Sequence, residues 1–125
     1  MQIDRSKWFY GGRFETVYYV SALFSSEANK FCCLGFLGCH IGLSQDNMNN
    51  ICLPFKTEQV WPHKLFEKTS SIELYSEPKG TNWADVLAHI NDLKKVHSDD
   101  RESWIKTGFK ELLGIDVEFV GEYPE

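Results

Sequence analysis

Apolar residues recur at helical spacing in the last third of the chain, which predicts two helices there. The first follows Asn82, a residue type that can cap a helix, and Asp85 stands at its third position as in a capping box. Its buried face is expected to consist of Trp83, Val86, Leu87, Ile90 and Leu93. His89 lies off that face, so we expect it to be solvated.

The second helix is predicted to open at Ser98 or Asp99, because Asp100 and Glu102 then lie near its positive end. Gly114 suits the left-handed position that follows a helix. The apolar stripe of this helix is expected to be Ile105, Phe109, Leu112 and Leu113. From position 115 to 120 Ile, Val and Phe occupy alternate positions, which predicts a half-buried strand.

Shorter elements are predicted in the first half. The segment from Arg13 to Phe24 is rich in Phe, Thr, Val and Tyr and favours a strand, and residues 25–29 favour a turn. Residues 31–34 either resume extended structure or begin a short helix that Gly42 can end. Ser44 can cap another short helix that continues through Asn50.

The stretch from Pro54 to Gly80 is expected to be irregular, with one short edge strand at 72–75. Together these elements predict an α+β fold, a small antiparallel or mixed sheet with three to four helices packed on one face. The length of 125 residues favours a single domain spanning 1–125.

The composition is that of a globular protein, with 42% hydrophobic and 25% charged residues. A chain of this length can bury enough surface to fold without disulfides or metal. Aromatic residues reach 14% and include four tryptophans. That surplus indicates either a well-filled core or a surface that docks a partner.

The formal net charge is −5, which gives no basic footprint for direct binding to nucleic acid. Between Glu111 and Glu125 there are five acids and no Lys or Arg. Such a tail is typically a solvated surface. It can also mimic a nucleic acid or meet a basic protein.

The oxidation state of the four cysteines depends on the compartment in which the protein resides. The most apolar stretch, 31–43, is far shorter than the ~20 residues of a membrane span, and no apolar leader follows a basic start. We therefore expect no membrane anchor and a reducing cytoplasm, in which Cys32, Cys33, Cys39 and Cys52 stay reduced. Zinc bound with His40 is the alternative, but adjacent Cys32 and Cys33 form a poor chelate. The favoured interpretation is that the four cysteines are small apolar residues of the core, and we expect no cofactor.

Motifs that carry catalysis are not found in the sequence. Gly11-Gly12 is too short to hold a phosphate, and a Cys–His nucleophile pair needs contacts that sequence does not show. The candidates for its histidine are His40, His63, His89 and His97. Asn91-Asp92 near a helix end either satisfies backbone groups of a loop or supplies an acid or ligand.

One segment resembles a known group of proteins. Residues 31–38, Phe-Cys-Cys-Leu-Gly-Phe-Leu-Gly, resemble the CCLG segment of small proteins from tailed phages and prophages. Leu53-Pro54, the helix end at 87–92 and the strand at 114–120 are also similar, over about two thirds of the chain. Many relatives carry a further Cys where Gly38 stands, which argues against a shared metal site. The resemblance implies an accessory protein acting in an infected bacterium, with no catalytic residue to carry over.

Two functions follow as hypotheses, both without catalysis. The first is an inhibitor that binds a host protein such as a defence protein, or equally an immunity protein for a toxin. Its exposed anchors are expected among Trp8, Phe9, Tyr10, Trp61 and Trp83.

The second hypothesis is a small-ligand binder, for instance a sponge for a nucleotide immune signal. Aromatics at positions 8–10 can stack on a base, and Arg5, Lys7 and Arg13 can meet phosphates. A homodimer is compatible with either hypothesis.

Overall fold

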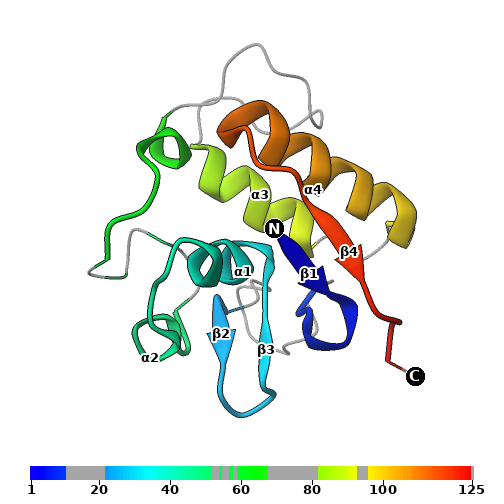
Figure 1. The fold of residues 1–125 in the computed structure, drawn as a ribbon, viewed down its shortest axis with the longest axis horizontal. Coiled ribbons are helices and arrows are strands. Elements are labelled where there is room, and N and C mark those ends of the chain that lie inside the picture. The colour runs from blue at the N-terminus through cyan, green and yellow to red at the C-terminus, as the bar shows by residue number, and fades with distance from the viewer. Residues whose placement is uncertain are drawn as a thin grey trace.

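A computed structural model describes residues 1–10, 22–51, 54, 57, 59–67, 82–92 and 96–124 (Figure 1). Its elements in chain order are β1 (Gln2–Asp4), the 3₁₀ turn η1 (Arg5–Lys7), β2 (Phe24–Ser25), β3 (Lys30–Phe31), α1 (Cys33–His40), α2 (Gln45–Met48), the 3₁₀ turn η3 (His63–Phe66), α3 (Trp83–Asp92), α4 (Ser98–Leu113) and β4 (Glu118–Val120). The α+β class predicted from the sequence is confirmed: helices pack against small sheets.

The two C-terminal helices form where the apolar spacing predicts them. Asn82 caps α3, because its Oδ1 accepts a hydrogen bond of 2.9 Å from the backbone N–H of Asp85. Helix α4 ends at Gly114, whose φ of 66° is the left-handed conformation expected after a helix. The predicted stripe residues Ile105, Phe109 and Leu112 are buried and Leu113 is half-buried. Leu93 of the predicted α3 face lies outside the described residues.

Among the described residues the strands form two two-stranded sheets, where the sequence predicted one small antiparallel or mixed sheet. Strands β1 and β4 pair in parallel with Ile3 opposite Phe119, and both side chains are buried. Strands β2 and β3 pair antiparallel. The N-terminal segment connects the two sheets, since the N–H of Phe9 donates a 2.7 Å hydrogen bond to the carbonyl of Phe31.

Helix α1 lies against β1, β3 and α3, so it occupies the centre of the fold. Its two glycines explain how it fits there. A Cβ on Gly35 would lie 1.7 Å from the carbonyl oxygen of Leu23, and one on Gly38 would lie 2.4 Å from Sδ of Met48. The glycines of the CCLG-like segment therefore allow close approach of neighbouring chain.

The remaining predictions have mixed outcomes. Ser44 caps α2 as expected, but the helix ends at Met48 because Asn49 is extended and Asn50 has a φ of 60°. Within the predicted strand from Arg13, only its last residues fall in the described part, and the predicted strand at 72–75 lies outside it. Among the helices of the described residues, none is long and apolar enough to cross a membrane.

Candidate functional site

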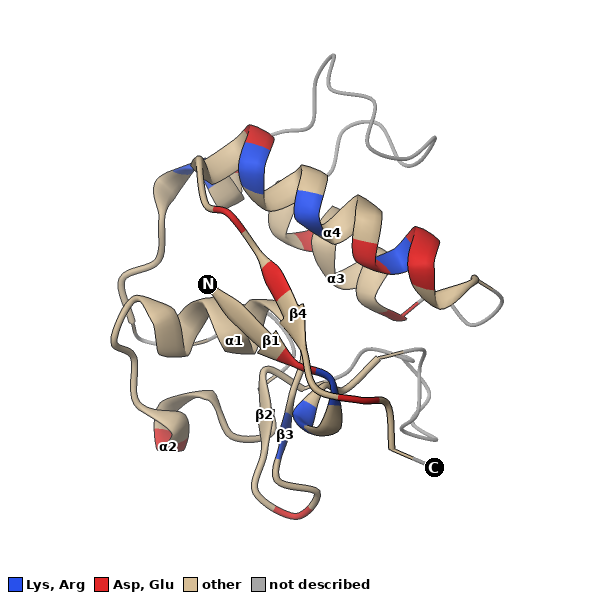
Figure 2. Cartoon of the chain, turned by 45° about the vertical axis from the view of Figure 1, so that its right-hand side comes forward, with Lys and Arg blue, Asp and Glu red and all other residues tan. Residues whose placement is uncertain are grey.

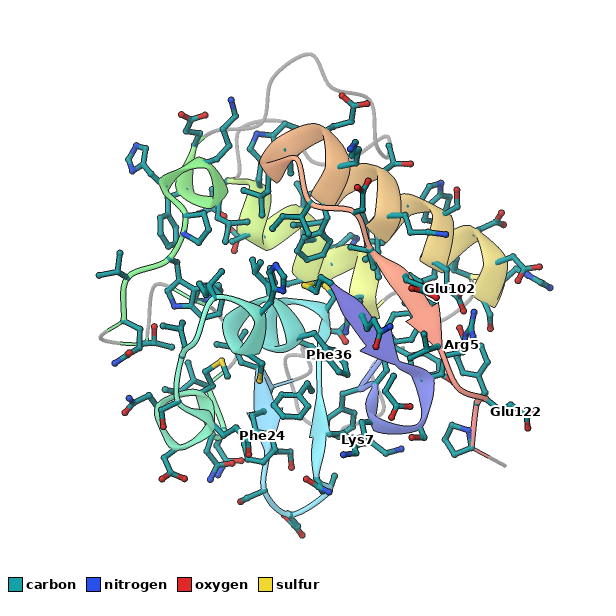
Figure 3. The ribbon with its side chains drawn as sticks, in the orientation of Figure 1. Arg5, Lys7, Phe24, Phe36, Glu102 and Glu122 are labelled. Carbon is teal, nitrogen blue, oxygen red and sulfur yellow. The ribbon has the colours of Figure 1, made fainter. Side chains whose placement is uncertain are left out.

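The sequence candidates at the N-terminus gather beside the C-terminal segment. The guanidinium of Arg5 forms a two-pronged ion pair with Glu102 of α4, at 2.9 Å from Nε and 2.8 Å from Nη2 (Figure 3). Its Nη1 donates a third hydrogen bond, of 2.8 Å, to the carbonyl of Gly121. Each of the three guanidinium nitrogens of Arg5 thus donates a hydrogen bond within its own chain.

Tyr123 lies over the same cluster. Its hydroxyl donates a hydrogen bond to Oε2 of Glu102, and its ring centroid is 6.3 Å from that of Trp8 and 5.5 Å from that of Tyr10. The Arg5 guanidinium stands 5.6 Å from the Tyr123 ring, within the range of a cation–π contact. These contacts tie the C-terminal segment to the N-terminal one.

The electrostatics of this cluster follow from its contacts. Burial alone would raise the pKa of Glu102, but hydrogen bonds from Arg5 and Tyr123 outweigh it and lower that pKa. The pKa of Arg5 is raised by its hydrogen bonds to Glu102. Burial, followed by the bond to Glu102, raises the pKa of Tyr123 to about 12. The pair is therefore ionised, and the phenol neutral, at neutral pH.

Behind this cluster, Asn91 joins three separate segments. It is fully buried, and its Oδ1 accepts from the indole Nε1 of Trp8 at 2.8 Å and from the N–H of Cys33 at 3.0 Å. Its Nδ2 donates to the carbonyl of Phe9 at 2.7 Å and to Oδ1 of Asp92 at 3.1 Å. The Asn91 side chain therefore satisfies backbone groups, one of the two roles that the sequence left open.

Arg101 is a buried residue that the sequence analysis did not single out. It is only 3% exposed, and its Nη1 donates to the carbonyls of Ile90 at 2.8 Å and Asn91 at 2.7 Å at the end of α3. Burial lowers its pKa, opposed by the nearby charge of Asp92. A cation in the first turn of a helix interacts unfavourably with the helix dipole. The position of Arg101 near the start of α4 was therefore the one feature of the sequence that could have marked it as a residue with a specific partner.

The other aromatic candidates do not form exposed anchors. The exposed fractions of Trp8, Phe9, Trp61 and Trp83 are 0%, 5%, 5% and 3%. The expectation of exposed anchors at these four positions is therefore wrong, because their rings fill the core. The indole N–H of Trp61 also donates a 2.8 Å hydrogen bond to Oγ1 of Thr57.

The remaining candidates differ in their exposure. Tyr10 is half-buried and Lys7 is exposed, whereas Arg13 lies outside the described residues. Exposed positions are also found for all four histidines, His40, His63, His89 and His97, which confirms the expectation for His89.

The described cysteines are free thiols. Cys32 and Cys33 are buried in the core, as the sequence favoured, while Cys39 is exposed. The Cys33 thiol donates to the carbonyl of Leu87 at 3.8 Å, and burial raises its pKa well above the ordinary value. Within the described ranges no group of His, Cys, Asp and Glu is placed to hold a metal ion. Cys52 lies outside those ranges.

The acidic C-terminal region forms one face of an extended segment. Asp116, Glu118 and Glu122 are exposed, whereas Val117 and Phe119 between them are buried. Figure 2 shows acidic residues along β4 and on either side of it. Asp116 lies 3.0 Å from Nζ of Lys110, so one member of this face is already paired.

Comparison with known proteins identified no matching family model, no similar curated protein and no similar solved structure. The resemblance to phage proteins therefore remains a prediction.

Proposed function

We propose that this protein is a non-catalytic binding protein of phage type, which inhibits a host protein such as a defence protein by covering part of its surface. The observation that carries the proposal is how the candidate side chains are used. Arg5 donates hydrogen bonds to Glu102 and to the carbonyl of Gly121. The indole of Trp8 donates to Asn91, and Asn91 in turn accepts the backbone N–H at the start of α1. In the free molecule these groups are engaged by bonds within the chain, which leaves the exposed surface as the first place for a partner to bind.

Binding then falls to the surface, and its charge indicates the partner. The exposed side of the C-terminal segment carries Asp116, Glu118 and Glu122. A surface of this sign attracts a basic patch on another protein and repels nucleic acid. The attraction between exposed charges weakens as salt screens it, which gives the proposal a simple signature.

Capture experiments test this proposal. The tagged protein is incubated with lysate of a bacterial host, next to a variant carrying Asp116→Asn, Glu118→Gln and Glu122→Gln. A matched control variant neutralises three exposed acids elsewhere, Glu27, Asp46 and Glu67. We expect one protein to be retained by the native chain and by the control, but not by the first variant. Retention should fall as salt is added.

Inhibition is measured on the captured protein after purification. We expect its activity to fall as the native chain is added and to be lost at about one equivalent. Identical retention on all three baits, or full activity of the captured protein in excess of the native chain, would contradict the proposal. An immunity protein that neutralises a toxin gives the same pattern with a toxin as its target.

The nucleotide-binding hypothesis has less support from the described contacts. Arg5, its first phosphate candidate, is bonded to Glu102, and Trp8, its first stacking candidate, is buried. Native mass spectrometry of the protein purified from a bacterial host tests it directly. An added mass that matches a nucleotide would favour this hypothesis over the inhibitor.

A further inference from the structure

The C-terminal strap, residues 121–124, lies on a surface built from two distant parts of the chain. Tyr123 is its half-buried residue, whereas Gly121, Glu122 and Pro124 are exposed. Figure 3 shows the strap leaving β4 near Arg5 and Glu102. The strap therefore contacts the body of the molecule through one aromatic side chain, that of Tyr123, and through the backbone carbonyl of Gly121.

The surface beneath the strap recognises two chemical features. Nη1 of Arg5 binds the carbonyl of Gly121, and two residues later the carboxylate of Glu102 accepts the hydroxyl of Tyr123. The ring of Tyr123 also lies near two aromatic rings, that of Trp8 in a tilted arrangement and that of Tyr10 in an edge-type one. A backbone carbonyl followed at this spacing by a tyrosine is a feature that any peptide segment can present.

The ion pair beneath the strap also has contacts that do not involve the strap. Glu102 and Arg5 bind each other in a two-pronged geometry, with side chains 13% and 25% exposed. Trp8 is fixed from behind by Asn91. Most of the recognition surface is thus held in place by contacts other than those of Tyr123, so it is preorganised for whichever tyrosine arrives.

We propose that this surface is a binding site for a tyrosine-bearing segment of another protein, and that Tyr123 occupies it in the free molecule. The strap begins at Gly121, whose φ of 75° turns the chain away from the direction of β4. A tethered segment competes with an effective concentration on the order of millimolar. A partner that presents a tyrosine and makes further contacts elsewhere on the molecule displaces it. This inference requires no inhibition and stands apart from the function proposed above.

Peptide binding to the full-length chain tests the inference. The probe is the capped peptide Val-Gly-Glu-Tyr-Pro, which has the sequence of residues 120–124. It is titrated into native protein, a Tyr123→Ala variant and a Pro124→Ala control, which changes an exposed residue of the strap and keeps Tyr123. The signal is the indole N–H resonance of Trp8. We expect saturable binding to Tyr123→Ala at a peptide concentration at least tenfold lower than the native chain or the control requires.

The chemistry of the probe is varied in the same assay. A peptide with Phe in place of Tyr should bind more weakly, since it lacks the hydroxyl that Glu102 accepts, and one with Ala should not bind. A folded Tyr123→Ala variant that gives no shift with the tyrosine peptide would overturn the inference.

If Tyr123→Ala does not fold, the native chain is titrated to peptide concentrations above the effective concentration of the strap. No change of the Trp8 signal there also overturns the inference. A native dimer that the peptide dissociates would show that a second copy supplies the tyrosine, which replaces the foreign partner proposed here.

Discussion

Trp8 and Asn91 are 83 positions apart in the chain, and the indole of Trp8 donates a 2.8 Å hydrogen bond to the Asn91 amide inside the core. Both side chains are fully buried. The same amide oxygen receives the N–H of Cys33, so the first residue of α1, the N-terminal segment and the end of α3 share one acceptor. A polar group with this many partners fixes how the three segments meet.

Replacing Asn91 by Ala is expected to destabilise the protein strongly. The indole N–H of Trp8, the N–H of Cys33 and the carbonyl of Phe9 would each lose a partner in the core. Since an unsatisfied buried group costs about 1–3 kcal/mol, we expect a loss of about 3 kcal/mol or more. Urea unfolding followed by tryptophan fluorescence measures it.

The control for this experiment is Asn47→Ala, at an exposed position of α2. It should change the free energy of unfolding by no more than about 0.5 kcal/mol. A loss at Asn91 as small as at Asn47 would show that the amide does not hold the segments together.

Two glycines of α1 offer a matched pair. A Cβ at position 35 would meet the backbone of Leu23, while one at position 38 would meet Sδ of Met48. The backbone of Leu23 cannot move aside as easily as the side chain of Met48 can repack. Gly35→Ala should therefore cost about 3 kcal/mol or more. Gly38→Ala should cost about 1 kcal/mol or less, because alanine favours the helix. Thermal unfolding of both variants measures the two losses of stability. Equal losses of stability in the two variants would contradict this description of the packing.

The elements with local signals were predictable from the sequence. Asn82 and Ser44 each cap the start of a helix with a side-chain oxygen, and Gly114, which has no side chain, adopts the left-handed conformation after α4. The division into two sheets was not predictable. It depends on β1 pairing with β4, and a contact across the whole chain leaves no local pattern.

The pH dependence of stability should reveal the Arg5–Glu102 pair. The folded pKa of Glu102 is lowered, so its contribution is present above the ordinary glutamate value of about 4.3 and is lost as pH falls through the folded value. We expect Glu102→Gln to be less stable than the native chain at pH 7. The difference between them should shrink as the pH is lowered into the acid range.

Urea unfolding at a series of pH values measures this difference. Glu111→Gln, at an exposed position of the same helix, serves as the control and should track the native chain throughout. A gap between Glu102→Gln and the native chain that stays constant down to the acid limit would contradict the ion-pair argument.

Arg101 and Asp92 are expected to be coupled. Arg101→Leu removes the donor that closes the end of α3 and the positive charge that interacts with the Asp92 carboxylate. Removing one of two interacting buried charges costs up to about 3–5 kcal/mol. Adding Asp92→Asn should recover part of the loss. A double-mutant cycle measured by urea unfolding would contradict the coupling if the two losses simply added.

The candidate site shows the limit of sequence reasoning more sharply than the fold does. The sequence grouped Arg5, Trp8 and Tyr10 because they are neighbours in the chain. Their partners Glu102 and Tyr123 come from the other end, and no spacing links them. The aromatic residues were ambiguous for another reason: a tryptophan suits a core and an interface equally well, and only its burial separates the two.

The cysteines provide a test of local stability. Alkylation requires an accessible thiolate, so exposed Cys39 should react with iodoacetamide before Cys32 and Cys33. Burial also raises the pKa of Cys39, and its rate should therefore stay below that of the same thiol in urea and rise with pH. Peptide mapping by mass spectrometry assigns each modified residue.

Modification of Cys33 should depend on opening of the core. Its thiol bonds the Leu87 carbonyl and its backbone N–H bonds Asn91, so it is released only when α1 separates from α3. Asn91→Ala lowers the free energy of that opening and should accelerate alkylation of Cys33, whereas the rate at Cys39 should barely change. If Cys33 reacted as fast as Cys39 in the native protein, the packing of α1 described above would be wrong. If Asn91→Ala accelerated both equally, Asn91 would not act specifically on the contact between these helices.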